Sequence, residues 1–137
     1  MRFEFGRRAA PAHILLGALV LIVTATSPTA ARHLSEKDKL MLVEYANSTA
    51  ESMGELYGIS RVCMPQAQED FSRVEMLKTT QPWLSADGQE EALLRWKMGY
   101  AAGVTVNCAR DGEARYGAAG TKLQNSMTGI LTLMRGE

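Results

Sequence analysis

Apolar and small residues recur at alternating steps of three and four through most of the chain after Ser35, which is the periodicity of α-helices with one buried face. Ser35, with Asp38 three residues later, resembles a capping box and predicts the start of the first helix. Met64 precedes Pro65, and the residue before a proline is disfavoured in the helical region, so this helix is predicted to end there. Its inner face would be Leu42, Ala46, Thr49, Met53, Leu56, Ser60 and Cys63.

Two further helical stretches follow. The second helix is predicted to begin at Pro65, which suits a first turn, and to end before residues 79–82. Its inner face would be Ala67, Phe71, Val74 and Leu77 or Lys78. The third helix would follow a loop at residues 83–88, with Ser85 or Asp87 as its cap. Its apolar side would be Leu93, Trp96, Tyr100, Val104 and Cys108.

A fourth helix is predicted to follow a turn at Asp111-Gly112 and to run to the C-terminus. Its inner face would be Tyr116, Ala119, Leu123, Met127, Ile130, Leu131 and Met134. No stretch shows the strict alternation of apolar and polar residues that a half-buried strand requires. The sequence therefore predicts an all-α, four-helix domain built as two helical hairpins.

One pattern, M-G-x-x-x-G-[IV]-[ST]-x-x-C, occurs at residues 53–63 and again at residues 98–108. Each copy places two glycines four residues apart on one helix face: Gly54 with Gly58, and Gly99 with Gly103. A glycine inside a helix costs about 1 kcal/mol relative to alanine, so four of them need a compensating interaction. We expect helix close-packing at these glycines. The alternative is that a short match of small residues recurred by chance.

Cys63 and Cys108 are the two cysteines of the chain, and an even count in an exported protein predicts a disulfide. A metal site or a nucleophilic thiol is the alternative, but the chain offers neither a C-x-x-C motif nor nearby histidines. If both cysteines end their helices, the first and third helices run in the same direction and cross at their glycines. The second and fourth helices would then return antiparallel to them.

Residues 1–31 have the features of a secretory signal peptide. Arg2, Arg7 and Arg8 are basic, residues 14–23 form an apolar run, and Ala30-Ala31 offers small residues for cleavage. A membrane anchor is the alternative, although a span needs about 20 apolar residues and this run is shorter. Residues 32–137 are then expected to form a single all-helical domain in the periplasm.

The charge and motif content of residues 32–137 argues against several functions. This segment has 12 Lys+Arg and 14 Asp+Glu, a formal charge of −2, and no basic run that would bind nucleic acid. Its one histidine, His33, lies near the expected new N-terminus. Acidic neighbours at residues 69–70 and 90–91 suit first helical turns better than paired acid and base catalysis. We expect no enzyme, no catalytic or metal site and no cofactor.

Aromatic and sulfur-containing side chains are the remaining candidates for a binding role. Trp83, Tyr57 and Tyr100 could form a binding surface, or they could cover the core. Seven methionines follow residue 31, and soft thioethers in an exported protein can bind copper. They are scattered, and Met53, Met127 and Met134 fall on predicted inner faces, so they are expected to fill the core.

A resemblance rests on Gly54-x-Leu56-Tyr57-x-x-x-Arg61-x-Cys63, then on Trp96-x-x-Gly99-Tyr100 and Cys108 with an alanine-rich last helix. This pattern resembles a family of small exported alphaproteobacterial proteins of unknown function with two cysteines in a helical domain. The resemblance implies export, helices and the disulfide, but no activity. The long segment at residues 79–88 departs from the pattern. More distantly, the chain looks like periplasmic immunity proteins and acid-stress chaperones, and likeness of fold is not likeness of function.

These observations favour a non-enzymatic periplasmic protein that binds another component of the cell envelope, namely a second protein. The alternative is a periplasmic stress chaperone or a toxin-neutralising, immunity-type inhibitor. The sequence leaves open whether the glycine ridges serve internal packing alone or a homodimer as well.

Overall fold

The computed structural model describes residues 33–136, so the predicted signal peptide lies outside the described residues. Four α-helices form the domain: α1 (Glu36–Cys63), α2 (Arg73–Thr80), α3 (Ala86–Val104) and α4 (Glu113–Arg135). Three short turns join them: the 3-10 turns η1 (Glu69–Phe71) and η2 (Gln81–Trp83), and the π-helical turn η3 (Cys108–Gly112). The described part of the chain contains no strand, so the prediction of an all-α domain of two helical hairpins is confirmed.

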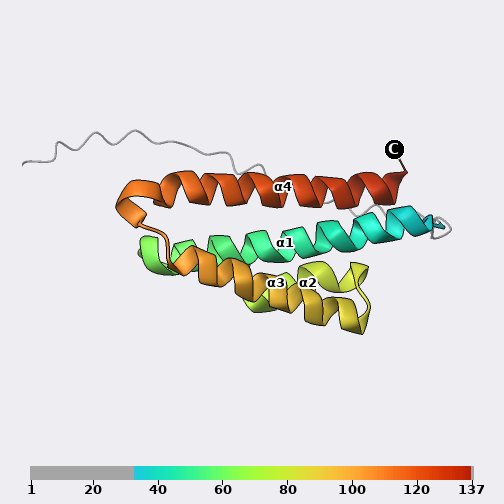
Figure 1. The fold of residues 1–137 in the computed structure, drawn as a ribbon, viewed down its shortest axis with the longest axis horizontal. Helices are drawn as coiled ribbons and strands as arrows, with labels where there is room; N and C mark the ends of the chain where they lie inside the picture. Colours follow the sequence, from blue (N-terminus) through green and yellow to red (C-terminus); the bar gives the residue numbers. More distant parts are fainter. Residues whose placement is uncertain (1–32, 137) are drawn as a thin grey trace, which may run out of the picture. The chain divides into compact units, whose positions relative to one another are not determined.

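The central helix is α1, which packs against α2, α3 and α4 and lies between α3 and α4 in Figure 1. Its N-terminus is capped as predicted, because the Ser35 hydroxyl oxygen accepts a 3.1 Å hydrogen bond from the backbone N–H of Asp38. Its last residue is Cys63, and Met64 before Pro65 is extended. The predicted ends of this helix are therefore confirmed.

Helices α1 and α3 run in the same direction and cross at the glycines of the repeated motif (Figure 1). A Cβ atom on Gly54 or Gly99 would overlap a backbone carbonyl group of the facing helix. A Cβ atom on Gly58 would lie 2.5 Å from the carbonyl oxygen of Tyr100, and one on Gly103 would lie 3.0 Å from the Cα atom of Gly58. The two backbones are thus in direct contact, which is the close approach that the motif predicts.

The Cys63 and Cys108 sulfur atoms are bonded, so the predicted disulfide is confirmed. The prediction that Cys108 ends the third helix is wrong, because α3 ends at Val104 and Cys108 begins η3. The side-chain oxygen of Asn107 accepts a 3.1 Å hydrogen bond from the backbone N–H of Arg110, so a new helical segment is capped just before the cysteine. The disulfide therefore joins the last residue of α1 to the first residue of η3, the turn that precedes α4.

The predicted turn at Asp111-Gly112 is also wrong, because η3 continues directly into α4. The break between the third and fourth helices lies instead at residues 105–107. A Cβ atom on Gly112 would lie 3.5 Å from the Cys63 sulfur atom, at ordinary contact distance. Gly112 therefore packs against the disulfide instead of ending a helix.

The second helix begins at Arg73, eight residues later than the predicted start at Pro65. Ser72 caps it, since its hydroxyl oxygen accepts from the backbone N–H of Glu75 at 3.5 Å. The preceding segment is held to α1 because the Ser60 hydroxyl oxygen accepts a 3.0 Å hydrogen bond from the backbone N–H of Gln68. A side chain of α1 thus holds these residues outside a helix. The third helix is capped by Ser85, one of the two predicted residues.

Helix α4 runs antiparallel to α1 (Figure 1), and polar contacts accompany buried apolar residues such as Ala119 and Ile130 along the seam. Four contacts follow one another along it: Tyr45 with Gly129, Ser48 with Ser126, Glu51 with Lys122, and Glu55 with Arg115. The Ser126 hydroxyl donates to the Ser48 hydroxyl at 2.7 Å, and the Lys122 ammonium lies 2.8 Å from the Glu51 carboxylate. Partly exposed ion pairs contribute about 0–1 kcal/mol each. We therefore expect α4 to be held less firmly than α3.

The core lies between α1, α2 and α3 and contains Ala46, Ala50, Met53, Met76, Leu84, Ala92 and Trp96. The expectation that methionines fill the core holds for Met53, which is buried. It is wrong for Met127 and Met134 on α4, which are 42% and 37% exposed. Although both residues fit the spacing of three and four residues in α4, they lie beside the face that contacts α1, not on it.

We predict that Gly99→Ala lowers the free energy of unfolding by about 3 kcal/mol, because the new methyl group would overlap the Glu51 carbonyl group. Gly117→Ala is the matched control, since a Cβ atom there meets nothing within 4 Å. It should raise the free energy of unfolding by up to about 1 kcal/mol through helix propensity. Denaturant unfolding of both variants measures this. Equal effects of the two substitutions would contradict the backbone contact.

We predict that the double variant Cys63→Ala/Cys108→Ala loses about 4 kcal/mol of stability, because the bond closes a loop of 45 residues in the unfolded chain. Thermal unfolding with and without a reducing agent measures this. The reductant should lower the melting temperature of the wild type and leave that of the variant unchanged. If the reductant did not change the melting temperature of the wild-type protein, the disulfide bond would not be formed.

Candidate functional site

Two of the three predicted binding residues, Tyr57 and Tyr100, lie in one aromatic cluster with Trp96. The Trp96 and Tyr100 rings are stacked, with centroids 5.3 Å apart, and the Tyr57 ring is tilted against both. The Trp96 indole N–H donates a 3.0 Å hydrogen bond to the carbonyl oxygen of Phe71. The Tyr57 hydroxyl donates to the Glu69 carboxylate at 3.3 Å. This cluster therefore fastens the segment between α1 and α2 to the core.

The third predicted residue, Trp83, lies apart from that cluster in η2, where its partly buried ring packs on the core. One edge of it lines an apolar hollow of about 200 Å³ together with Pro82, Met127 and Leu131. The structure thus does not bring Trp83 together with the tyrosines. The hollow also brings Trp83 close to Met127 and Leu131 of α4, a contact that the sequence did not predict.

A second apolar hollow, of about 270 Å³, lies beside the disulfide. Ile59, Met64 and Tyr116 line it around the two sulfur atoms. Burial raises the pKa of the Tyr116 phenol above its ordinary value, so this side chain stays neutral at physiological pH. The hollow is mainly apolar, and Glu113 is the one carboxylate that lines it.

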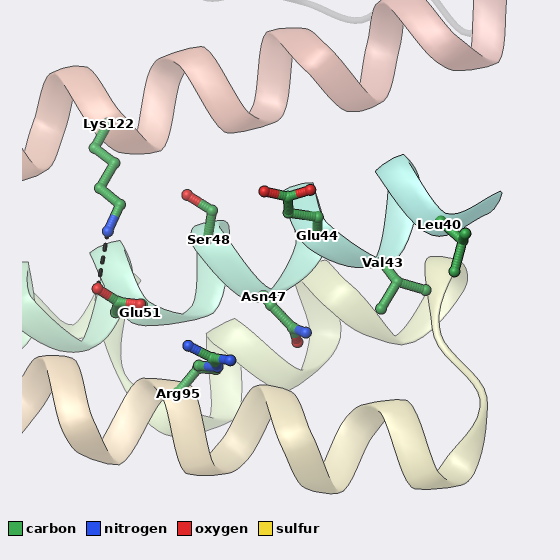
Figure 2. Close-up of a pocket in the computed structure, with 8 residues that line it drawn as sticks. All are labelled: Leu40, Val43, Glu44, Asn47, Ser48, Glu51, Arg95 and Lys122. Atoms are coloured by element: carbon green, nitrogen blue, oxygen red, sulfur yellow. Dashed lines mark hydrogen bonds and ion pairs between the residues drawn. The ribbon is translucent and has the colours of Figure 1, made fainter. Parts of the chain in front are cut away.

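A third hollow is a polar groove of about 510 Å³, shown in Figure 2, with α1 as its floor. Arg95 of α3 and Lys122 of α4 line its two sides, and Figure 2 shows Lys122 reaching Glu51. Arg95 is paired with Glu91 of its own helix at 2.8 Å. The other residues that line it are Leu40, Val43, Glu44, Asn47 and Ser48, all from α1. We call this set of eight residues the α1 groove.

Two acceptors in the α1 groove have no partner among the described residues. The side-chain oxygen of Asn47 is buried and accepts no hydrogen bond from the described part of the protein. Glu44 forms no ion pair with any residue in that part of the chain. Since both cations beside them are already paired, the groove offers acceptors to a donor from outside. Leu40, 72% exposed, and Val43, 39% exposed, add apolar surface at one end.

Sequence reasoning missed the α1 groove, because its residues come from three helices whose packing was not known. One signal was present: Leu40, Val43 and Asn47 recur at helical spacing beside the inner stripe of the first helix. A second stripe on a helix indicates a second surface, although it does not show whether that surface is covered. The groove is the candidate functional site that the geometry supports best.

The described residues give no indication of metal chemistry or of membrane spanning. Within residues 33–136, no three histidine, cysteine, aspartate or glutamate side chains gather as a metal-binding group. None of the helices in this range is long and apolar enough to cross a bilayer. The expectation that the protein is not an enzyme and holds no cofactor stays a prediction.

Comparison with known proteins gives no assignment. The chain matches no protein family, no curated protein and no solved structure. The resemblance to small exported proteins with two cysteines therefore stays a prediction. Any functional conclusion has to come from the geometry of the domain itself.

We predict that Trp96→Phe lowers the free energy of unfolding by about 2 kcal/mol, because the Phe71 carbonyl would lose its donor and Tyr100 its stacked indole. Tyr57→Phe, which removes a long hydrogen bond at the surface, should cost less than about 1 kcal/mol. In the Trp96→Phe variant, Trp83 is the one remaining tryptophan, and its fluorescence can follow unfolding. If Tyr57→Phe were the more harmful change, this assignment of roles would be wrong.

Proposed function

We propose that the protein is exported to the periplasm, has no enzymatic activity and acts by binding another protein of the cell envelope through the α1 groove. The basic and apolar N-terminal segment and the disulfide support export. The observation that carries the binding proposal is that Asn47 lines an open groove and its side-chain oxygen has no donor within residues 33–136, so that a rotation of the amide would present this oxygen to a partner. A buried acceptor without a donor costs about 1–3 kcal/mol, which a partner's donor would recover.

The chemistry of the groove defines the partner segment. Asn47 and Glu44 both accept hydrogen bonds, and the negative charge of Glu44 favours a cation, so a lysine or arginine side chain fits best. The exposed Leu40 and Val43 would contact an apolar residue of the same segment. The partner is thus a protein with a basic residue close to an apolar one on an exposed segment.

A stress chaperone is the second candidate, and the exposed apolar side chains of α4 favour it. Met127, Leu131 and Met134 are all more than a third exposed, and contiguous apolar surface binds unfolded chains. The two candidates differ in the class of partner. The α1 groove suits a particular folded protein, whereas a chaperone would bind many unfolded ones. Immunity-type inhibition rests on the sequence likeness alone.

We predict that Asn47→Leu stabilises the isolated protein by about 1 kcal/mol and abolishes binding to the partner, because it removes the unpaired acceptor and fills the groove. A photo-crosslinking residue at Val43 should form an adduct with one envelope protein in living cells. The same residue at Val74, which is exposed on α2, is the control and should form none. Loss of the Val43 adduct with Asn47→Leu would support the proposal.

Three results would contradict it. An adduct that forms equally from Val43 and Val74 would show that contact is not confined to the groove. An adduct that persists in the Asn47→Leu variant would show that this side chain does not hold the partner. No adduct under any growth condition would remove the proposal itself.

A further inference from the structure

Helix α4 carries two parallel stripes of residues: the protein covers one of them, and the other stays largely exposed, although its Met127 and Leu131 line the hollow beside Trp83. The inner stripe, formed by Tyr116, Ala119, Leu123, Ser126 and Ile130, is buried or partly buried toward α1. One residue further on is a second set with the same alternation of threes and fours, which we call the outer stripe: Gly117, Gly120, Gln124, Met127, Leu131 and Met134. A repeat of this kind over nearly three heptads is the pattern of a helix that packs on another helix.

The glycines of the outer stripe have no role inside the protein. The four glycines of the repeated motif lie against backbone, and Gly129 lies beneath the Tyr45 ring. By contrast, a Cβ atom on Gly117 or Gly120 would meet nothing within 4 Å. Each glycine in an exposed helix costs about 1 kcal/mol relative to alanine. The domain does not recover this cost, although it recovers the same cost at its other helical glycines.

The outer stripe is small in its first half and large in its second. Gly117, Gly120 and Gln124 precede Met127, Leu131 and Met134. If two copies of α4 pair antiparallel, Gly117 meets Met134, Gly120 meets Leu131 and Gln124 meets Met127, so every layer joins a small or polar residue to a large one. A parallel pair would instead set glycine against glycine and leucine against leucine. The stripe is therefore complementary to itself in the antiparallel sense.

Charge supports the same orientation. Glu113 begins α4 and Arg135 ends it, and neither forms an ion pair within residues 33–136. Antiparallel pairing brings the Glu113 end of one helix to the Arg135 end of the other, at both ends of the pair. The dipoles of the two helices also oppose each other favourably in this orientation. A parallel pair would bring like charges together.

We propose that the outer stripe of α4 is the interface of a homodimer in which two copies of α4 pack antiparallel. This surface is separate from the α1 groove, so the inference does not depend on the proposed function. With three large apolar residues per copy, the interface is expected to give a weak, reversible dimer. Glycine at positions 117 and 120 leaves room for the Met134 and Leu131 side chains of the second copy.

The test is a size swap at one layer of the interface, measured by sedimentation equilibrium on protein purified from cells that express the full chain. Gly120→Leu should raise the dissociation constant at least about 30-fold, because two such clashes with Leu131 occur in each dimer. Leu131→Ala should raise it less. The double variant Gly120→Leu/Leu131→Ala should dimerise more tightly than Gly120→Leu, because the large and small residues have exchanged sides.

The matched control is Ala118→Leu, which adds a leucine to an exposed position of the same helix away from the outer stripe and should leave dimerisation unchanged. Thermal unfolding should show that Gly120→Leu folds as well as the wild type, because the site is open in the single chain. Three results would each overturn the proposal: a wild-type monomer at every concentration, tighter dimers with Gly120→Leu, or no recovery in the double variant. Tighter dimers would indicate a parallel pair.

Discussion

The contact between the backbones of α1 and α3 is the interaction on which the rest of the domain depends. Four glycines allow two parallel helices to approach until a methyl group on either would overlap the other helix. At this distance, many weak dispersion contacts add up along both backbones. The aromatic cluster is formed by residues of the crossing itself and the disulfide lies just beyond its end, and both secure the segments that leave it. Everything else packs onto this pair of helices.

The contrast between α3 and α4 follows from that constraint. Helix α3 meets α1 through glycine and direct backbone contact, whereas α4 meets it through side chains: apolar residues such as Ile130, hydroxyls, ion pairs and one aromatic ring. The α1 groove opens along the central helix, with one wall from each of these helices. We propose that the close pair of α1 and α3 holds Asn47 in place, while α4 presents the outer stripe on another side of its helix.

The sequence predicted the helices and the disulfide because each depends on local pattern: periodicity, a cap at Ser35, a proline after Met64 and two cysteines. The sequence-based prediction of helix ends failed where a contact with another residue sets the backbone conformation. Ser60 holds the residues after Pro65 outside a helix, and Asn107 starts a new segment before Cys108. The α1 groove could not be predicted for the same reason, since its walls come from helices far apart in sequence. The predicted inner face of the fourth helix combined residues of both stripes of α4, because two adjacent stripes have the same spacing along the sequence.

The most direct test of the central claim is hydrogen exchange of individual backbone amides in the native protein. If the glycine crossing is the most stable unit, the slowest amides lie at residues 51–59 and 96–103, and those of α4 exchange at least about tenfold faster through local opening. Amides of α4 as slow as those of the crossing, or slower, would show that the helices are held equally. The account of a rigid α1–α3 pair that carries a less firmly held α4 would then be wrong.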